Sequence, residues 1–115
     1  MQQDTDTSKG QTMKTVTICG SMRFQKQMQE IAFALETGHG MNVLQCVYDS
    51  GHGVAAGDKA ALAAAHRRKI ELSDAIYVVD IQGYIGHSVS EEIAFAKALG
   101  KEIIYHSELE DISGE

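Results

Sequence analysis

The sequence predicts a small α/β domain in which helices flank a parallel sheet of four to five strands. Apolar, β-branched runs alternate with segments of helical periodicity in the order β-α-β-α-β-α-β. The connections between successive strands are long enough for right-handed parallel crossovers. Residues 75–80 are apolar on both faces, which is typical of a central strand in such a sheet. Together these patterns indicate a doubly wound, Rossmann- or flavodoxin-like architecture.

The first predicted strand and helix lie in the N-terminal third of the chain. Residues 15–19 form a β-branched run that ends at Gly20. From residue 22 the period changes to that of a helix, which stops at Gly38, as expected for a C-terminal glycine. The apolar stripe of this helix consists of Phe24, Met28, Ile31 and Leu35.

The middle of the chain supplies a second strand and a second helix. Residues 41–47 are a mainly apolar strand, and the glycine-rich loop 48–53 that follows is predicted to be mobile. The alanine-rich segment 58–73 predicts a helix. Its inward face consists of Leu62, Ala65, His66, Lys69 and Ile70, and Arg67, Arg68 and Glu71 turn outward.

A glycine turn and a third helix follow the central strand. Ser88 and Glu91 match a capping box, which predicts that this helix starts at about Ser88. The helix ends at Gly100, and residues 102–105 form the last predicted strand.

Length and composition predict one globular domain. The 115 residues suffice for one core, and 43% hydrophobic and 23% charged residues are ordinary proportions for a globular protein. We expect a disordered leader over residues 1–13, a single domain over 14–107 and an acidic tail over 108–115. No apolar run approaches the roughly 20 residues that cross a bilayer, and no signal peptide is recognised, so we expect no membrane partner.

Charge and cysteine content narrow the possible partners. The net charge of −6 argues against a nucleic-acid polymer, which needs a basic face, but a single nucleotide needs only a local anion pocket. Cys19 and Cys46 both lie in apolar runs, so we expect free buried thiols and a cytoplasmic location. Neither has a second cysteine or a histidine at metal-ligand spacing, so the sequence predicts no metal and no cofactor.

The stretch 84–96 carries the strongest indication of a functional site. It follows the central strand, turns on glycine and enters the third helix. In that helix Glu92 shares a face with Phe95 and Ala96, so its carboxylate points toward the sheet, at the end where a doubly wound sheet opens its ligand crevice. An inward carboxylate costs free energy unless it is paired or partly solvated, which favours a catalytic role. Glu91 is interpreted as the capping residue.

A second candidate site lies where the first strand meets the first helix, at Gly20, Ser21 and Arg23. Backbone N–H groups at a helix start, a hydroxyl and a guanidinium all favour an anion such as a phosphate. The alternative is that Ser21 only caps the helix and Arg23 is solvated. The chain lacks a Walker lysine and a Gly-x-Gly-x-x-Gly motif after this strand, so neither a P-loop nor a dinucleotide site is predicted.

Four further residues are candidates for ligand contacts. Asp80 ends the central strand at the crevice, although a turn or cap role is the simpler explanation. Gly86 and His87, in the turn before Ser88, are placed to touch a ligand. His66 lies on the inward face of the second helix and is either a supporting residue or a half-buried histidine with a structural role.

Two of these motifs resemble parts of a known superfamily. Residues 18–23 (Ile-Cys-Gly-Ser-Met-Arg) are similar to the opening motif of the 2′-deoxynucleoside 5′-monophosphate N-glycosidases. Residues 92–96, with Gly100 and Lys101 following, resemble the glutamate-containing helix of the nucleoside 2-deoxyribosyltransferase superfamily. With Ser73-Asp74-Ala75 before the central strand, the resemblance covers roughly residues 15–105. The motifs are short, and their order and spacing carry the resemblance.

The resemblance implies cleavage or transfer at the N-glycosidic bond of a (deoxy)nucleoside or its 5′-monophosphate. Glu92 matches the family's nucleophile, which attacks the anomeric carbon and forms a glycosyl-enzyme intermediate. Ser21 and Arg23 match the family's phosphate-binding loop, and Ser88 would be a further phosphate or ribose contact. Members are commonly homodimers or higher homo-oligomers, so the resemblance also implies self-association.

Two positions depart from the pattern of the family's transferases. Gly86 stands where they carry an aspartate before the catalytic glutamate, and His66 matches a second aspartate. His66 and His87 are therefore the substitutes available for protonating the base. Two rival hypotheses remain open at this point: a non-catalytic nucleotide-binding module that senses a ligand, and a structural α/β partner domain in which Glu92 is a buried, paired carboxylate.

Overall fold

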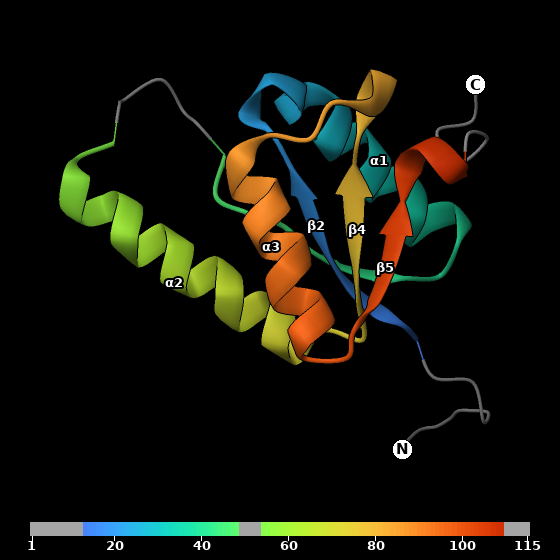
Figure 1. Cartoon of the computed structure of the whole chain (residues 1–115). Helices are drawn as coiled ribbons and strands as arrows, with labels where there is room; N and C mark the ends of the chain where they lie inside the picture. The colour runs from blue at the N-terminus through green and yellow to red at the C-terminus, as the bar shows by residue number, and fades with distance from the viewer. Residues whose placement is uncertain (1–12, 49–53, 110–115) are drawn as a thin grey trace, which may run out of the picture.

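The computed structural model describes residues 13–48 and 54–109 and shows an α/β fold (Figure 1). Four strands form one all-parallel sheet in the order β3-β2-β4-β5. Their bounds are β2 (Thr15–Gly20), β3 (Asn42–Leu44), β4 (Ala75–Val79) and β5 (Glu102–Tyr105). The α-helices that connect them are α1 (Gln25–Gly38), α2 (Ala56–Leu72) and α3 (His87–Ala98). The predicted fold class is therefore confirmed, and the layout is compatible with a Rossmann- or flavodoxin-like fold.

Three parts of the predicted organisation lie outside the described residues. These are the leader up to residue 12, most of the glycine-rich loop (49–53) and the acidic tail from residue 110. Every strand and helix that the structure describes falls between residues 15 and 108, close to the single domain predicted over 14–107.

Strand β4 is central in the sheet, as its apolar sequence predicts. All of its residues are buried, and it pairs with β2 on one side and with β5 on the other. Ile76 and Val78 belong to the core beneath α3, whereas Ala75, Tyr77 and Val79 belong to the core beneath α1. A strand that is covered on both faces has no solvated side, which explains its unbroken apolar sequence.

Two apolar cores join the helices to the sheet. Helix α1 covers one face, and α2 and α3 lie over the other (Figure 1). On the α1 side, the helix contributes Met28, Ile31, Ala32 and Leu35. The other core consists of Cys19, Ile70, Ile76, Val78, Val89, Ile93 and Ala96. Each large apolar side chain buried in this way stabilises the fold by about 1.5–3 kcal/mol, so these stripes fix the helices on the sheet.

Helix α2 is the least buried of the α-helices. Among its described side chains only His66 and Ile70 are buried, and both lie in its second half. Its N-terminal half projects away from the sheet in Figure 1. Ala65, predicted to face inward, is exposed, because the buried stripe of α2 runs through His66 and Ile70 instead. None of the described helices, α2 included, has the length and apolar character that crossing a membrane requires.

The second strand is shorter than its sequence predicts. Of the predicted residues 41–47, only the three of β3 pair with β2. Beyond β3, the Gln45 carbonyl accepts a hydrogen bond from Lys69 Nζ at 2.6 Å. A side chain of α2 therefore takes the place of a backbone donor from a neighbouring strand. Cys46, predicted to be a buried strand residue, consequently lies outside the strand and is half-buried.

The third helix starts one residue earlier than predicted, and the capping box is not formed. Gly86 is the N-cap in an extended conformation, and its carbonyl accepts a hydrogen bond from the N–H of Ser90 at 3.0 Å. Ser88 therefore lies inside the first turn, and no side chain caps the helix. The prediction that Glu91 caps the helix is also wrong: its Oε2 lies 3.2 Å from Nε2 of the exposed His87.

Candidate functional site

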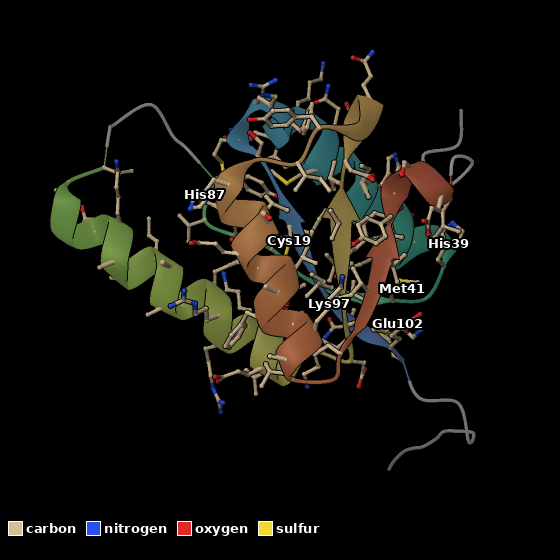
Figure 2. All side chains as sticks on the ribbon, viewed as in Figure 1. Cys19, His39, Met41, His87, Lys97 and Glu102 are labelled. Atoms are coloured by element: carbon tan, nitrogen blue, oxygen red, sulfur yellow. The ribbon has the colours of Figure 1, made fainter. Side chains whose placement is uncertain are left out.

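Three chemically active side chains converge where β2, α2 and α3 meet: Cys19, His66 and Glu92. Nε2 of His66 lies 3.5 Å from Cys19 Sγ and 3.6 Å from Glu92 Oε1. The three potential ligand atoms all lie within 4.8 Å of one another. In Figure 2, Cys19 lies on β2 behind α3, and the same apolar core contains residues of both elements. We refer to these three residues as the cluster.

Glu92 reaches the cluster because of its position on α3. Val89 and Ala96, three residues before and four residues after it, are buried against the sheet, so Glu92 shares the inward face of the helix. Its side chain is 24% exposed, which lets water or a ligand reach the carboxylate. Its direction is the one that the helical spacing predicts. A partly solvated carboxylate beside an imidazole avoids the full cost of burying a charge.

His66 is the only polar residue of α2 that the structure buries, among those whose side chains are described. It is 8% exposed and lies one turn before the buried Ile70. Its Nε2 faces Cys19 and Glu92, whereas its Nδ1 is buried and has no hydrogen-bond partner among the described residues.

The Cys19 thiol stays protonated near neutral pH. Burial raises its pKa well above the usual value, and the negative charge of Glu92, a hydrogen bond with Glu92 and the nearby Cys46 raise it further. The residue is 1% exposed. A nucleophilic cysteine needs the opposite setting, in which neighbouring positive charge stabilises the thiolate. Cys19 is therefore a neutral neighbour of Glu92 rather than a nucleophile of its own.

Arg23 lies above the end of β2, in the short 3-10 helix η1 (Met22–Phe24) that precedes α1. Ser21 Oγ accepts a hydrogen bond from the N–H of Arg23 at 3.2 Å, so the capping role considered for Ser21 is present. The Arg23 guanidinium stacks on Tyr84, with Cζ 3.8 Å from the ring centroid, and Tyr84 also meets Phe24 edge-on at 6.0 Å. Over residues 13–48 and 54–109, Arg23 has no carboxylate partner, so its charge is available to an anion.

The Arg23–Tyr84 stack stands beside the start of α3. A Cβ added to Gly86 would lie 3.3 Å from Tyr84 Oη, so the N-cap of α3 and the ring are in contact. The first-turn N–H groups of α3 have no side-chain cap, and the N-terminus of a helix favours negative charge. Ser88 adds an exposed hydroxyl in that turn. We refer to Arg23, Tyr84, Gly86 and Ser88 as the rim.

The rim and the cluster belong to one surface. Ser88 and Glu92 are four residues apart in α3 and therefore lie on the same face, one turn from each other. His87, one residue before Ser88, is 86% exposed and faces Glu91. Of the two histidines predicted to assist, His66 is the one that lies beside Glu92.

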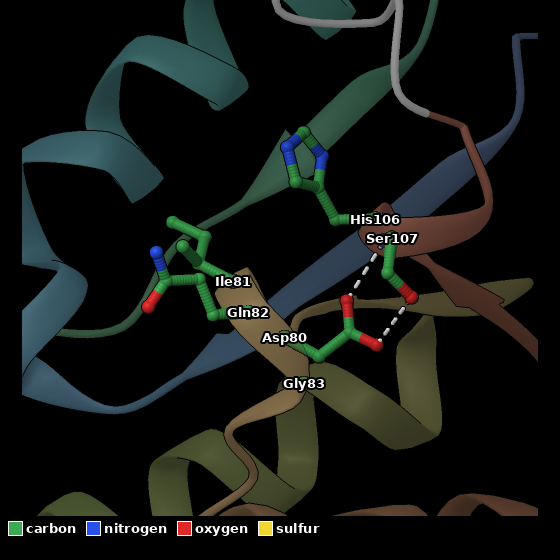
Figure 3. Close-up of a pocket in the computed structure, with 6 residues that line it drawn as sticks. All are labelled: Asp80, Ile81, Gln82, Gly83, His106 and Ser107. Carbon is green, nitrogen blue, oxygen red and sulfur yellow. Dashed lines mark hydrogen bonds between the residues drawn. The ribbon is translucent and has the colours of Figure 1, made fainter.

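Asp80 makes its hydrogen bonds outside the cluster and the rim. Both of its carboxylate oxygens accept hydrogen bonds from Ser107, from the backbone N–H at 2.8 Å and from Oγ at 2.7 Å (Figure 3). It lines an open cavity of about 330 Å³ at the carboxyl ends of β4 and β5. The other lining residues are Ile81, Gln82, Gly83, His106 and Ser107. Asp80 thus holds the segment after β5. Its side chain does not cap the turn that it begins, so the tether to Ser107 differs from the turn or cap role considered for it.

The same end of the sheet contains a pair formed by the buried Tyr77 and the half-buried His106. Tyr77 Oη and His106 Nδ1 lie 2.7 Å apart. Burial lowers the pKa of His106, against the opposing effect of the Asp80 charge. Burial, and then the Asp80 charge, raises the pKa of Tyr77 to about 12. Both groups are therefore neutral at physiological pH, and the pair is a hydrogen bond between a hydroxyl and a neutral imidazole.

Gly20, predicted to contact a substrate, has a packing reason of its own. A Cβ there would lie 2.7 Å from Met28 Sδ and 3.1 Å from Val79 Cβ. Any side chain at this position would therefore force Met28 or Val79 to shift in the contact between β2, α1 and β4.

The structure brings the predicted residues into three groups. His66 and Glu92 meet in the cluster. Ser21 lies next to Arg23 at the rim, to which Gly86 and Ser88 also belong. Asp80 forms a third group with Ser107. Cys19 is the residue that sequence reasoning missed as a site member. Strand alternation could have indicated it, because Cys19 shares a face with Thr17 and Val78 near the carboxyl end of β2.

The chain was also compared with known proteins. No model of a protein family matches it, and a search of curated proteins found no similar sequence.

Proposed function

We propose that the chain is an enzyme that cleaves or transfers the N-glycosidic bond of a nucleoside or nucleoside 5′-monophosphate, with Glu92 as nucleophile. The observation that carries the proposal is the placement of Glu92 next to His66 and one turn from the uncapped start of α3. One group suited to attack a sugar and one surface suited to bind an anion thus share a helix face. The sequence resemblance agrees with this assignment.

In the proposed reaction, a Glu92 oxygen attacks the anomeric carbon as the bond to the base breaks. The electron pair of that bond leaves with the base, which takes up a proton, and a glycosyl ester forms on Glu92. Water then displaces Glu92 and completes hydrolysis, or a second base does so and completes transfer. The Glu92 side chain is 24% exposed, which supports its role as nucleophile, because the sugar must reach the carboxylate from solvent.

His66 is the group that we assign to support Glu92. Retaining glycoside cleavage normally pairs two carboxylates, one as nucleophile and one as acid. Among the described residues, the group next to Glu92 is instead an imidazole, with Nε2 at 3.6 Å. We propose that this imidazole orients Glu92 and supplies or relays the proton that the base needs.

The phosphate of a 5′-monophosphate would bind at the rim. Arg23 is exposed and has no carboxylate partner among residues 13–48 and 54–109, and its stack on Tyr84 holds it beside Gly86. The uncapped N–H groups of α3 and the Ser88 hydroxyl offer further donors. Ser21 contributes indirectly, because its side chain fixes the turn that carries Arg23.

The second candidate is a nucleotide-binding module without catalysis. The rim supports it independently, because anion binding there does not require Glu92 to react. Tight nucleotide binding without release of base would favour this alternative.

We also propose that the protein acts as a homodimer or higher homo-oligomer in the cytoplasm. The support for self-association is the exposed alanine surface of α2, which projects from the sheet (Figure 1) and includes Ala60, Ala61, Ala63, Ala64 and Ala65. The support for the location is that both cysteines are free thiols, as a reducing compartment maintains them.

A base-release assay with a pair of adjacent glutamate variants tests the enzyme. The protein is incubated with a panel of nucleosides and 5′-monophosphates, and free base is quantified by chromatography. We expect Glu92→Gln to reduce base release by at least about a thousandfold while ligand binding persists, since loss of a nucleophile removes the covalent route.

Glu91→Gln is the matched control. It removes the same charge from the next residue, which is exposed and faces His87 rather than the cluster. Its base release should stay within about threefold of the parent. Equal activity of the Glu92→Gln variant and the parent would refute the nucleophile assignment. Binding of a nucleotide to the parent without any base release would refute the enzyme and favour the binding module.

A further inference from the structure

The cluster unites a thiol, an imidazole and a carboxylate, which are the side chains that bind zinc in proteins. They come from three elements that are distant in the sequence, so no metal-ligand spacing exists along the chain. We propose that Cys19 Sγ, His66 Nε2 and a Glu92 carboxylate oxygen bind one zinc-like divalent cation. This inference goes beyond the proposed glycosidic chemistry, which requires no metal.

The separations of the ligand atoms suit a tetrahedral ion. With a Zn–S bond of about 2.3 Å and a Zn–N bond of about 2.05 Å, tetrahedral angles place sulfur and nitrogen about 3.6 Å apart. Cys19 Sγ and His66 Nε2 are separated by 3.5 Å. The corresponding N···O separation is about 3.3 Å, against 3.6 Å between His66 and Glu92. A small rotation of the Glu92 side chain closes that difference.

The charges of the cluster also suit a divalent cation. One thiolate and one carboxylate neutralise the two positive charges, and the imidazole binds in its neutral form. As the metal–sulfur bond forms, the S–H bond of Cys19 breaks and its proton passes to solvent. Magnesium and calcium prefer ligand sets made entirely of oxygen, so the thiolate favours zinc and its substitutes cobalt and cadmium.

The surroundings of the cluster fix two ligands and leave one side open. Cys19 and His66 are 1% and 8% exposed and are held by the packing of β2 and α2. Glu92 is 24% exposed, so the fourth coordination position can face solvent. Cys46 is the neighbouring thiol, and Lys69 lies beside it. Cys46 does not belong to the set of ligand atoms that lie within 4.8 Å of one another.

Cobalt spectroscopy tests this site without any nucleotide. The full chain is treated with a chelator, dialysed and titrated with Co²⁺. We expect a charge-transfer band from sulfur to cobalt at one equivalent, together with the intense visible bands of four-coordinate Co²⁺. Added Zn²⁺ should abolish both. No sulfur-to-cobalt band in the parent protein would overturn the proposal.

Two matched cysteine variants identify the ligand. The chain has two cysteines, so a sulfur-to-cobalt band has two possible sources. Cys19→Ser should abolish the band and lower Zn²⁺ affinity at least tenfold, whereas Cys46→Ser should retain the band and the affinity. Loss of the band in Cys46→Ser, or its persistence in Cys19→Ser, would refute the assignment. Circular dichroism checks that each variant is folded. Glu92→Gln, at a half-exposed position, is an independent variant of a second ligand, and its Zn²⁺ affinity should also fall at least tenfold.

The metal site and the proposed enzyme share Glu92, and their tests separate them. Metal binding is measured by absorbance, so the outcome does not depend on whether base is released. If base release occurs in chelator, stoichiometric Zn²⁺ should suppress it, because a metal-bound carboxylate cannot attack the sugar. Unchanged base release with Zn²⁺ bound would show that the metal is held without Glu92 and would overturn the proposed ligand set.

Discussion

Asp80 accepts two hydrogen bonds from Ser107, one from the backbone N–H and one from the hydroxyl. Asp80 directly follows β4, and Ser107 lies in the 3-10 helix (His106–Glu108) after the neighbouring strand β5, so the pair ties these two segments together. Asp80 is 6% exposed, and the two hydrogen bonds satisfy its buried carboxylate oxygens. The residue is therefore part of the scaffold that holds the segment after β5.

Asp80→Ala should destabilise the protein without altering catalysis. Two hydrogen bonds to a charged acceptor are lost and two donors of Ser107 lose their partner, so we expect the free energy of unfolding to fall by about 2–4 kcal/mol. Ser107→Ala removes the hydroxyl bond alone and should cost about 1–2 kcal/mol. Urea unfolding measures both values. A normal stability combined with a raised KM for nucleotide would show instead that Asp80 contacts the substrate.

Gly20→Ala should destabilise the packing between β2, α1 and β4. The added methyl group would lie 2.7 Å from Met28 Sδ, closer than side chains pack, and 3.1 Å from Val79 Cβ, which is a tight contact. Overpacking of this kind costs about 1–3 kcal/mol. Gly57→Ala is the matched control, because a Cβ there meets nothing within 4 Å. Chemical unfolding of the two variants should therefore give opposite results, with Gly57→Ala unchanged or slightly more stable. Equal effects would contradict the packing explanation.

The stability of the protein should rise with pH through the titration of His106. Burial lowers the pKa of His106 below its ordinary value of 6.5 in the folded protein. Between that lowered pKa and 6.5, His106 binds more protons in the unfolded chain than in the folded protein. The contribution of His106 to stability is therefore complete above pH 6.5 and is lost as the pH falls toward its pKa in the folded protein. Urea unfolding from about pH 5 to about pH 8 measures the slope.

His106→Asn isolates that contribution. The Asn Oδ1 atom can accept a hydrogen bond from the Tyr77 hydroxyl in place of the His106 Nδ1 atom, but the Asn side chain does not titrate. The variant should therefore have a smaller increase of stability with pH than the parent. An identical slope in both proteins would show that other groups cause the dependence.

His66→Met should reduce base release while leaving stability unchanged or higher. The buried Nδ1 has no partner among the described residues, which costs about 1–3 kcal/mol, and methionine fills a similar volume without polar atoms. Ile70→Ala, one turn further on the same face, is the structural comparison and should cost about 2–5 kcal/mol. Thermal unfolding and the base-release assay are measured on both. A His66→Met variant as destabilised as Ile70→Ala would show that His66 has a packing role.

The features that sequence predicted correctly are those determined within one element. The apolar run of β4 specifies a strand buried on both faces, and the spacing of Glu92 with Ala96 specifies its direction. Both depend on backbone geometry, which is the same in every protein. The start of α3 was predicted one residue too late, at Ser88 instead of His87. The extended conformation of Gly86 makes that residue the N-cap, and the sequence does not reveal this conformation.

The cluster could not be predicted because it depends on how separate elements pack. Cys19 and His66 are 47 residues apart, and they meet only because α2 lies across the end of β2 at one particular position. The shortening of β3 also depends on the packing of α2, since Lys69 of this helix donates a hydrogen bond to the Gln45 carbonyl. Neither the helix position nor the side-chain contact leaves a periodic pattern in the sequence.

The projecting half of α2 should be visible in the rates at which backbone amides exchange with deuterium. Its buried anchors, His66 and Ile70, lie in the second half, so amides near residues 59–63 can open locally while those near 68–72 stay closed. His66 stands at the boundary between these two parts. A molecule or ion that bridges His66 and Glu92 would extend the anchored part of α2 toward its N-terminus, and slower exchange there would report occupancy of the cluster before any product is measured.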